Sequence, residues 1–274
     1  MAIWKQIVKN HPELLTDEAD RLYEELIPEQ SNEDVKQQLT RYREWLRRCR
    51  VVGVDVACLR IESMLVVGEL NNQALSEIEI GNYVNAESFL MRAAEELSKV
   101  DEAEGPELVD TLYFTGVLHL KMANYEAAET ELRQAIASHR RIYGRENEQL
   151  AAMIGVLAEV YRETEDYASA MPLYDEDLDI SQRLKGETDP GVATSLHNKG
   201  LLYFDLGDYA KAQQFLEQAL EIRELALESD SPELAASFNC LGELHKKYLK
   251  YLGSRLQGEG ENICSRSWPG PCRR

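Results

Sequence analysis

The side chains best suited to chemistry are histidines and a run of carboxylates, and their spacing decides whether they can act together. His119 and His245 are 126 residues apart (245−119), and Tyr161 and Tyr203 stand at one third and two thirds of that interval. The spacing predicts that these histidines replace a packed aromatic ring and share neither a metal nor a catalytic site. The chain also has no His-Glu-x-x-His motif, phosphate-binding loop or serine elbow.

The carboxylate run contains Asp175, Glu176, Asp177 and Asp179. Two carboxylates work as acid and base only when both face one substrate, whereas on a helix most of these side chains point to water. We therefore predict no catalytic residue. A hydrolase that uses this cluster is the least favoured interpretation.

The elements that position these residues follow from a repeat. An acid or amide followed by tyrosine recurs every 42 residues (125−83, 167−125 and 209−167), at Asn82-Tyr83, Asn124-Tyr125, Asp166-Tyr167 and Asp208-Tyr209. Small residues recur nine positions before the tyrosine, as Ala74, Gly116, Ala158, Gly200 and Gly242. Self-similarity at such a period predicts stacked helix pairs, and the small residues let the helices approach closely. The acid or amide is expected to cap the second helix of each pair.

These residues carry a resemblance to a known family. The tetratricopeptide repeat pattern is matched by Leu196, Gly200, Tyr203, Ala212, Leu216 and Ala219. The 42-residue length and the stretch Asp-Pro-Gly-Val-Ala-Thr-Ser-Leu-His-Asn (189–198) resemble the repeats of kinesin light chains. The resemblance implies an all-α, right-handed α-α superhelix, a tetratricopeptide repeat solenoid, whose concave face binds peptides or helices of other proteins.

The chain is expected to have three parts. The array covers residues 66–251 as four full units and one leading helix, and a helical leader precedes it at 1–65. Residues 252–274 mix glycine, proline and arginine, which predicts a disordered tail. A reading-frame slip or a truncation of a longer array would explain why the repeat stops there.

The leader offers two interpretations of its own. Its segments 11–16 and 45–50 resemble the leader of bacterial multidomain repeat proteins, some of which end in a caspase-like protease domain. Five arginines of the second leader helix form a basic cluster, at positions 41, 43, 47, 48 and 50. A solvated face paired with acidic neighbours is the simpler interpretation, and a docking site for an acidic partner is the alternative.

One charge pair is predicted between repeats. Asp177 takes the place of a buried alanine, and Lys199 in the next unit takes the place of a leucine. A buried charge is tolerable when it is paired. We therefore expect a structural ion pair between Asp177 and Lys199.

The partner-binding groove is expected on the first helix of each pair, opposite the small residues. Repeat counting assigns to it Asp110, Tyr113, Val117, Glu159, Arg162, Thr194, His197, Leu201, Asn239, Glu243 and Lys246. Asn198 joins this set because it matches the second asparagine of a Leu-Asn-Asn-Leu-Ala stretch in kinesin light chains, whereas His197 departs from the first. The Lys, Asn and Arg set with which chaperone co-factors of this repeat class hold a terminal carboxylate is missing. No cofactor is expected.

The net charge restricts the classes of partner, and the cysteine usage indicates the cellular location. The chain has 30 basic and 49 acidic side chains, a net charge of −19, which disfavours nucleic acid and membrane surfaces and favours a basic protein or peptide. Five scattered cysteines without a Cys-x-x-Cys pair favour a cytoplasmic protein. The sequence thus predicts a non-catalytic interaction scaffold. The alternative is the regulatory arm of a larger bacterial multidomain enzyme, such as a caspase-like protease, cut short here.

Overall fold

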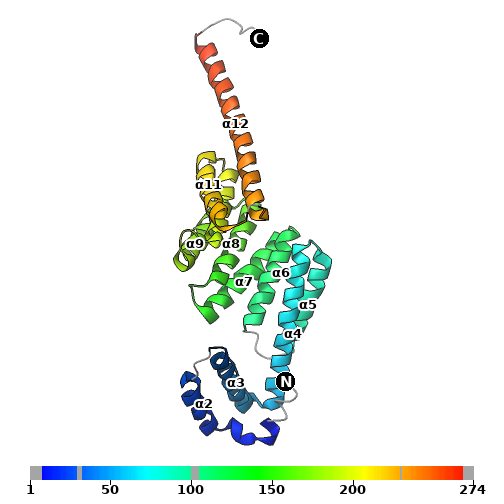
Figure 1. Cartoon of the computed structure of the whole chain (residues 1–274). Helices are drawn as coiled ribbons and strands as arrows, with labels where there is room; N and C mark the ends of the chain where they lie inside the picture. The colour runs from blue at the N-terminus through cyan, green and yellow to red at the C-terminus, as the bar shows by residue number, and fades with distance from the viewer. Residues whose placement is uncertain (1–7, 30–32, 100–104, 229, 268–274) are drawn as a thin grey trace. The chain divides into compact units, whose positions relative to one another are not determined.

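A computed structural model of the chain describes residues 8–29, 33–99, 105–228 and 230–267. None of these residues lies in a strand, and their helices pack in adjacent pairs, so the predicted all-α repeat fold is confirmed. The chain divides into two compact units, Met1–Leu118 and His119–Arg274 (Figure 1).

The first unit begins with a short 3-10 turn and continues in long helices. These are η1 (Pro12–Leu15), α2 (Asp17–Glu29), α3 (Glu33–Val52), α4 (Val54–Glu79), α5 (Tyr83–Ser98) and most of α6 (Pro106–Lys121). Because α4 is continuous, the boundary expected between residues 65 and 66 falls inside a helix.

The basic face of α3 is paired with acids of α2. Arg43 lies 2.8 Å from Asp20, Arg47 lies 2.7 Å from the same carboxylate, and Arg50 lies 2.6 Å from Asp17. These contacts agree with the interpretation in which acidic neighbours neutralise the arginine cluster.

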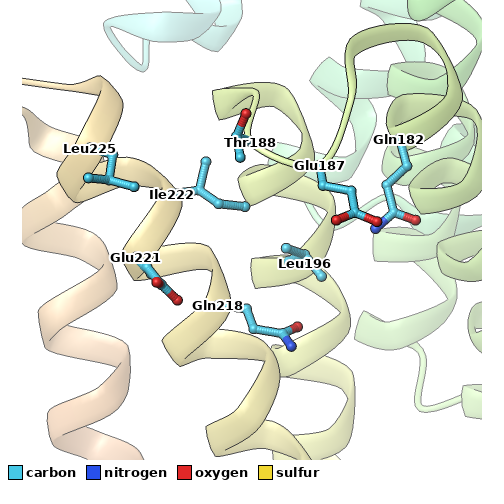
Figure 2. Close-up of a pocket in the computed structure, with 8 residues that line it drawn as sticks. All are labelled: Gln182, Glu187, Thr188, Leu196, Gln218, Glu221, Ile222 and Leu225. Carbon is cyan, nitrogen blue, oxygen red and sulfur yellow. The ribbon is translucent and has the colours of Figure 1, made fainter.

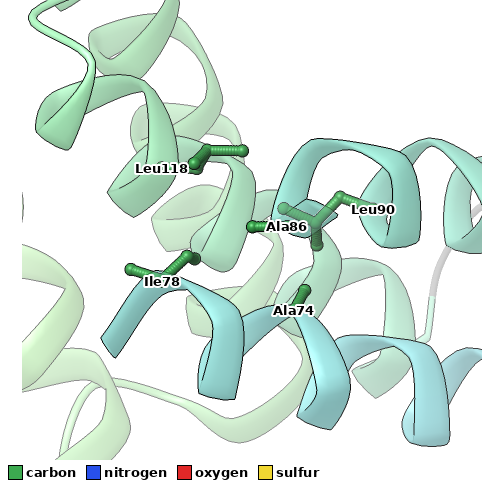
Figure 3. Packing of buried hydrophobic residues seen from close by; sticks show 5 residues of the cluster. All are labelled: Ala74, Ile78, Ala86, Leu90 and Leu118. Atoms are coloured by element: carbon green, nitrogen blue, oxygen red, sulfur yellow. The ribbon is translucent and has the colours of Figure 1, made fainter. Parts of the chain in front are cut away.

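The core of the first unit shows why small residues recur. Figure 3 shows Ala74 and Ile78 of α4 beside Ala86 and Leu90 of α5, with Leu118 of α6 completing the cluster. Both alanines are completely buried. Because their side chains are small, the helix backbones can approach closely, and the larger side chains fill the space around them.

The second unit continues the pairs. After the end of α6 come α7 (Tyr125–Tyr143), α8 (Glu148–Glu163), α9 (Tyr167–Lys185), α10 (Pro190–Asp205), α11 (Tyr209–Ala226) and α12 (Pro232–Ser267). Each of these helices from α7 onward packs against the next one along the chain. Three buried residues, Ala135, Ala170 and Ala212, keep these packings close.

The turn inside each pair repeats with the sequence. A residue with positive φ stands at Gly81, Ala123, Glu165 and Gly207, and the amide that follows each one donates to a carbonyl five residues back. This geometry is the Schellman ending of a helix, and glycine adopts it with least strain. The repeat therefore fixes the conformation of the turn even where the residue is not glycine.

The predicted helix caps are only partly present. Asp166 and Asp208 accept a hydrogen bond from the amides of Ser169 and Lys211, each at 3.2 Å. Asn82 and Asn124 occupy the same cap position, but their side chains form no capping hydrogen bond. The prediction that these two asparagines cap their helices is therefore wrong. A carboxylate is the stronger acceptor for such amides.

Helix α12 extends into the segment for which a disordered tail was expected. It continues to Ser267, through much of the segment 252–274 for which disorder was expected, and residues 268–274 lie outside the described residues. The physical reason is that glycine weakens a helix by only about 1 kcal/mol, and no proline occurs between Pro232 and Pro269.

Candidate functional site

The residues expected in the groove lie on α6, α8, α10 and α12, the first helices of their pairs. In the first unit, Asp110, Tyr113 and Val117 lie on α6 and are half-buried. Burial, helped by the nearby charge of Glu107, raises the pKa of Asp110. Val117 packs against the core of Figure 3, so part of this side chain is already used by the fold.

On α8 the two expected residues are tied to neighbouring helices. Arg162 Nη1 lies 2.6 Å from the Asp205 carboxylate at the end of α10, and Arg162 Nη2 contacts the Glu163 carboxylate. Glu159 lies 3.8 Å from Lys121. Arg162 therefore holds two successive first helices together and has little capacity left for a partner.

On α10, Thr194 is exposed, whereas His197, Asn198 and Leu201 are half-buried. The Nε2 atom of His197 lies 3.7 Å from the Cys240 sulfur on α12, and its Nδ1 atom is buried without a hydrogen-bond partner among the described residues. Burial, reinforced by the positive charge of Arg223, lowers the pKa of His197 to about 4. This imidazole is therefore neutral at physiological pH.

On α12, Asn239, Glu243 and Lys246 are all exposed. The ammonium of Lys246 lies 3.4 Å from the Glu243 carboxylate one turn away. Such a surface pair contributes little stability, so both side chains can turn to a partner. The residues of α8, α10 and α12 lie in the second unit, and the assignment of the whole set to one groove stays a prediction.

The predicted pair between Asp177 and Lys199 is corrected. The ammonium of Lys199 lies 2.6 Å from Asp175, two residues earlier on α9, and 4.8 Å from the centre of the Phe215 ring. Asp175 keeps 53% of its side chain exposed, so this ion pair retains water around one partner and avoids most of the penalty of burying two charges.

Asp177 instead lies in a polar interior position where α8, α9 and α10 meet. It is 5% exposed, accepts a hydrogen bond of 3.4 Å from Ser181, and lies 3.1 Å from where a Cβ of Gly155 would stand. Burial raises the pKa of Asp177 to about 6, although hydrogen bonds from Ser195 and Ser181 act the other way. Hydroxyls take the place of the expected ammonium.

Sequence reasoning missed a hollow in the second unit. It has a volume of about 380 Å³ and lies between α9, α10 and α11 (Figure 2). Its lining combines three apolar side chains with polar and acidic ones: Leu196, Ile222, Leu225, Gln182, Thr188, Gln218, Glu187 and Glu221. The sequence feature that could have indicated this hollow is Leu225, an apolar residue outside the repeat pattern. The structure leaves this side chain 80% exposed.

The two carboxylates give the hollow a negative rim. Figure 2 shows Glu187 and Glu221 on either side of Leu196. Both are exposed, and neither forms an ion pair with any cation in the part of the chain that the structure describes. An apolar floor between unpaired acids suits a side chain that is both aliphatic and cationic.

Two other kinds of site are missing from the described ranges. No group of three or more His, Cys, Asp or Glu side chains there is arranged to hold a metal ion. No described helix combines the length and the apolar character that crossing a bilayer requires.

Comparison with known proteins agrees with this geometry. A family model described as tetratricopeptide repeat matches residues 116–179, 148–225 and 193–250. Tetratricopeptide repeats are thus detected over residues 116–250. These matches run from the end of α6 into the first half of α12, where the structure shows the paired helices. No curated protein matches the sequence.

Several solved structures share the tetratricopeptide repeat fold. BtubC (BKLC) from P. vanneervenii is 21% identical, with 84% of this chain and 90% of that chain covered and a TM-score of 0.60. A putative kinesin light chain of Podosopora anserina is 18% identical, with 74% and 97% covered and a TM-score of 0.55. A Rap protein complexed with competence and sporulation factor is 17% identical, with 94% and 74% covered and a TM-score of 0.59. At these identities the likeness shows the fold alone.

Proposed function

We propose that this tetratricopeptide repeat protein is a non-catalytic scaffold that binds a peptide or helix of a partner protein with basic character. The observation that carries the proposal is the hollow of the second unit, with its apolar floor and its two unpaired carboxylates. A cytoplasmic location is part of the proposal and is supported by the scattered cysteines.

Physical chemistry explains the kind of segment that fits. Leu196, Ile222 and Leu225 offer apolar surface to a leucine or to the stem of a lysine or arginine. Glu187 and Glu221 attract the cationic head group, and the net charge of −19 raises the rate at which a basic partner arrives. Peptide recognition commonly combines apolar anchors with complementary charge in this way.

The relatives give the proposal limited support. One structural neighbour is a Rap protein in complex with competence and sporulation factor, so a fold of this kind accommodates a bound factor there. Extension to this chain rests on the hollow and on the exposed side chains of α10 and α12, such as Thr194, Asn239 and Lys246.

A displayed peptide library tests the proposal. The unaltered chain should enrich peptides in which leucine or phenylalanine stands next to lysine or arginine. Leu225→Asp should weaken the binding of those peptides about tenfold or more, because the apolar contact is lost and the leucine or phenylalanine of the peptide would have to desolvate a carboxylate. Val84→Asp is the matched control, since Val84 in the first unit is 78% exposed and Leu225 is 80% exposed.

Glu221→Gln tests the role of charge at the same site. It should reduce binding and weaken the dependence of affinity on salt, because one attracting carboxylate is lost while the shape is kept. Equal binding by the Leu225→Asp, Val84→Asp and unaltered chains would refute the hollow as the binding site.

A further inference from the structure

Arg223, on α11, is a buried cation without an acidic partner. It is 5% exposed, and its Nη1 atom donates to the Ser237 hydroxyl at 2.6 Å and to the Glu233 carbonyl at 3.5 Å. Its Nη2 atom donates to the Thr194 hydroxyl at 3.4 Å. Within the described ranges no carboxylate forms an ion pair with this guanidinium.

The fold does not require a charge at this position. Counting back by the 42-residue repeat gives Ser181, His139 and Leu97, so packing between pairs tolerates a neutral residue there. Removing a cation from water without a counter-charge is unfavourable. Burial lowers the pKa of Arg223, but a guanidinium stays protonated in proteins.

The groups around Arg223 converge from three helices. Thr194 on α10 is exposed, and its contact with Nη2 is long enough to be replaced by a better acceptor. His197 on α10 carries the buried Nδ1 atom without a partner, and its Nε2 atom faces Cys240 of α12. The negative charge of Glu233 acts on Arg223 and opposes the lowering of its pKa by burial, but the Glu233 carboxylate accepts a hydrogen bond from Ser231 at 2.6 Å and forms no ion pair with the guanidinium.

We propose that Arg223, together with Thr194 and His197, binds an oxyanion at the junction of α10, α11 and α12. The ligand is a carboxylate or a phosphate group of a partner molecule. Nη1 keeps its hydrogen bonds to Ser237 and Glu233, so Nη2 donates to the ligand once its long contact with Thr194 is released, and the threonine hydroxyl adds a second donor. The site is independent of the hollow, whose lining does not include Arg223.

The acidic surface of the chain makes a single oxyanion site at Arg223 selective. A surface with 49 acidic side chains repels anions in general, so an oxyanion is held only where a buried cation lacks a partner. The ligand would then be a molecule whose net charge is not strongly negative and which carries a single accessible carboxylate or phosphate.

Thermal unfolding with two simple probes tests the site. Sodium phosphate and sodium acetate are each compared with sodium chloride at the same ionic strength. The unaltered chain should melt at a temperature that rises with probe concentration, because a ligand that binds only the folded state stabilises it. The stronger of the two probes identifies the class of oxyanion.

Arg223→Leu copies the residue of the first pair and removes the binding group. This variant should melt at the same or a higher temperature than the unaltered chain in chloride, and its melting temperature should not respond to either probe. Arg183→Leu is the matched control, since Arg183 on α9 is half-exposed and pairs with Glu146, and it should respond as the unaltered chain does.

A second measurement does not depend on a variant that folds poorly. The imidazole NMR signals of His197 in the unaltered chain, assigned with His197→Gln, should shift when phosphate replaces chloride. A melting temperature that ignores both probes, together with unmoved His197 signals, would overturn the site. Loss of the response in Arg183→Leu as well would also overturn it. Neither result would bear on peptide binding in the hollow, which the Leu225→Asp comparison tests separately.

Discussion

Replacing Asp177 by asparagine should stabilise the second unit at neutral pH. The side chain is 5% exposed, and its pKa is raised by burial to about 6 from an ordinary value of 3.8. Asparagine keeps the size and the contacts with the two serine hydroxyls, but it carries no charge. The gain should therefore equal the penalty of burying the ionised carboxylate.

The size of the effect follows from proton linkage. One pKa unit corresponds to about 1.36 kcal/mol, so a rise from 3.8 to about 6 corresponds to about 3 kcal/mol when the carboxylate is ionised. Because the folded pKa is the higher one, the folded chain binds the proton more tightly. The contribution of this carboxyl group to the stability of the unaltered chain is fully present below about pH 3.8 and is lost as the pH rises through about 6.

Denaturant unfolding of both chains between about pH 4 and pH 8 measures this difference. Asp177→Asn should gain up to about 3 kcal/mol at the upper end and almost nothing at the lower end. Asp175→Asn is the control, because Asp175 is half-exposed and its pair with Lys199 should change stability by about 1 kcal/mol or less. A gain that does not vary with pH, or a loss of stability at neutral pH, would refute the reasoning.

Two further predictions concern the backbone of the repeat. A Cβ added at Gly200 would stand 2.8 Å from Leu216 Cγ, whereas one at Gly242 meets no atom within 4 Å. Gly200→Ala should therefore lower the free energy of unfolding by roughly 1–3 kcal/mol, and Gly242→Ala should leave it unchanged or raise it slightly, as chemical denaturation would show. Equal effects would contradict the close packing of Gly200 against Leu216. Ala123→Gly and Glu165→Gly should each raise the melting temperature, by an amount equivalent to roughly 1 kcal/mol, because both residues have positive φ; a lower melting temperature in both would contradict the turn geometry.

The repeat made most of the fold predictable. A recurrence of 42 residues specifies helix length, turn length and the places of buried alanines such as Ala135 and Ala219, because each pair must fit an identical neighbour. It also placed Thr194 and His197 on the first helix of a pair. Periodicity therefore succeeds where one residue position has the same surroundings in every copy.

The failures concern positions where the copies differ. Lys199 has a flexible stem, and counting cannot tell whether it reaches Asp175 or Asp177, which are two residues apart on one helix. Nothing in the sequence singles out Arg223, because the equivalent positions in other units hold unrelated residues, such as Leu97 and the buried His139. The hollow depends on the loop at Glu187 and on the side chains around it, which no period describes.

The buried carboxylate of α9 has a consequence for how the second unit comes apart. In a linear array each pair is supported by its neighbours alone, so a junction that holds an uncompensated charge is weaker than the same junction without that charge. The junction around Asp177 should therefore open more readily above the raised pKa of about 6, whereas below it α8, α9 and α10 should unfold as one longer cooperative block. Acidity thus sets how many pairs melt as one.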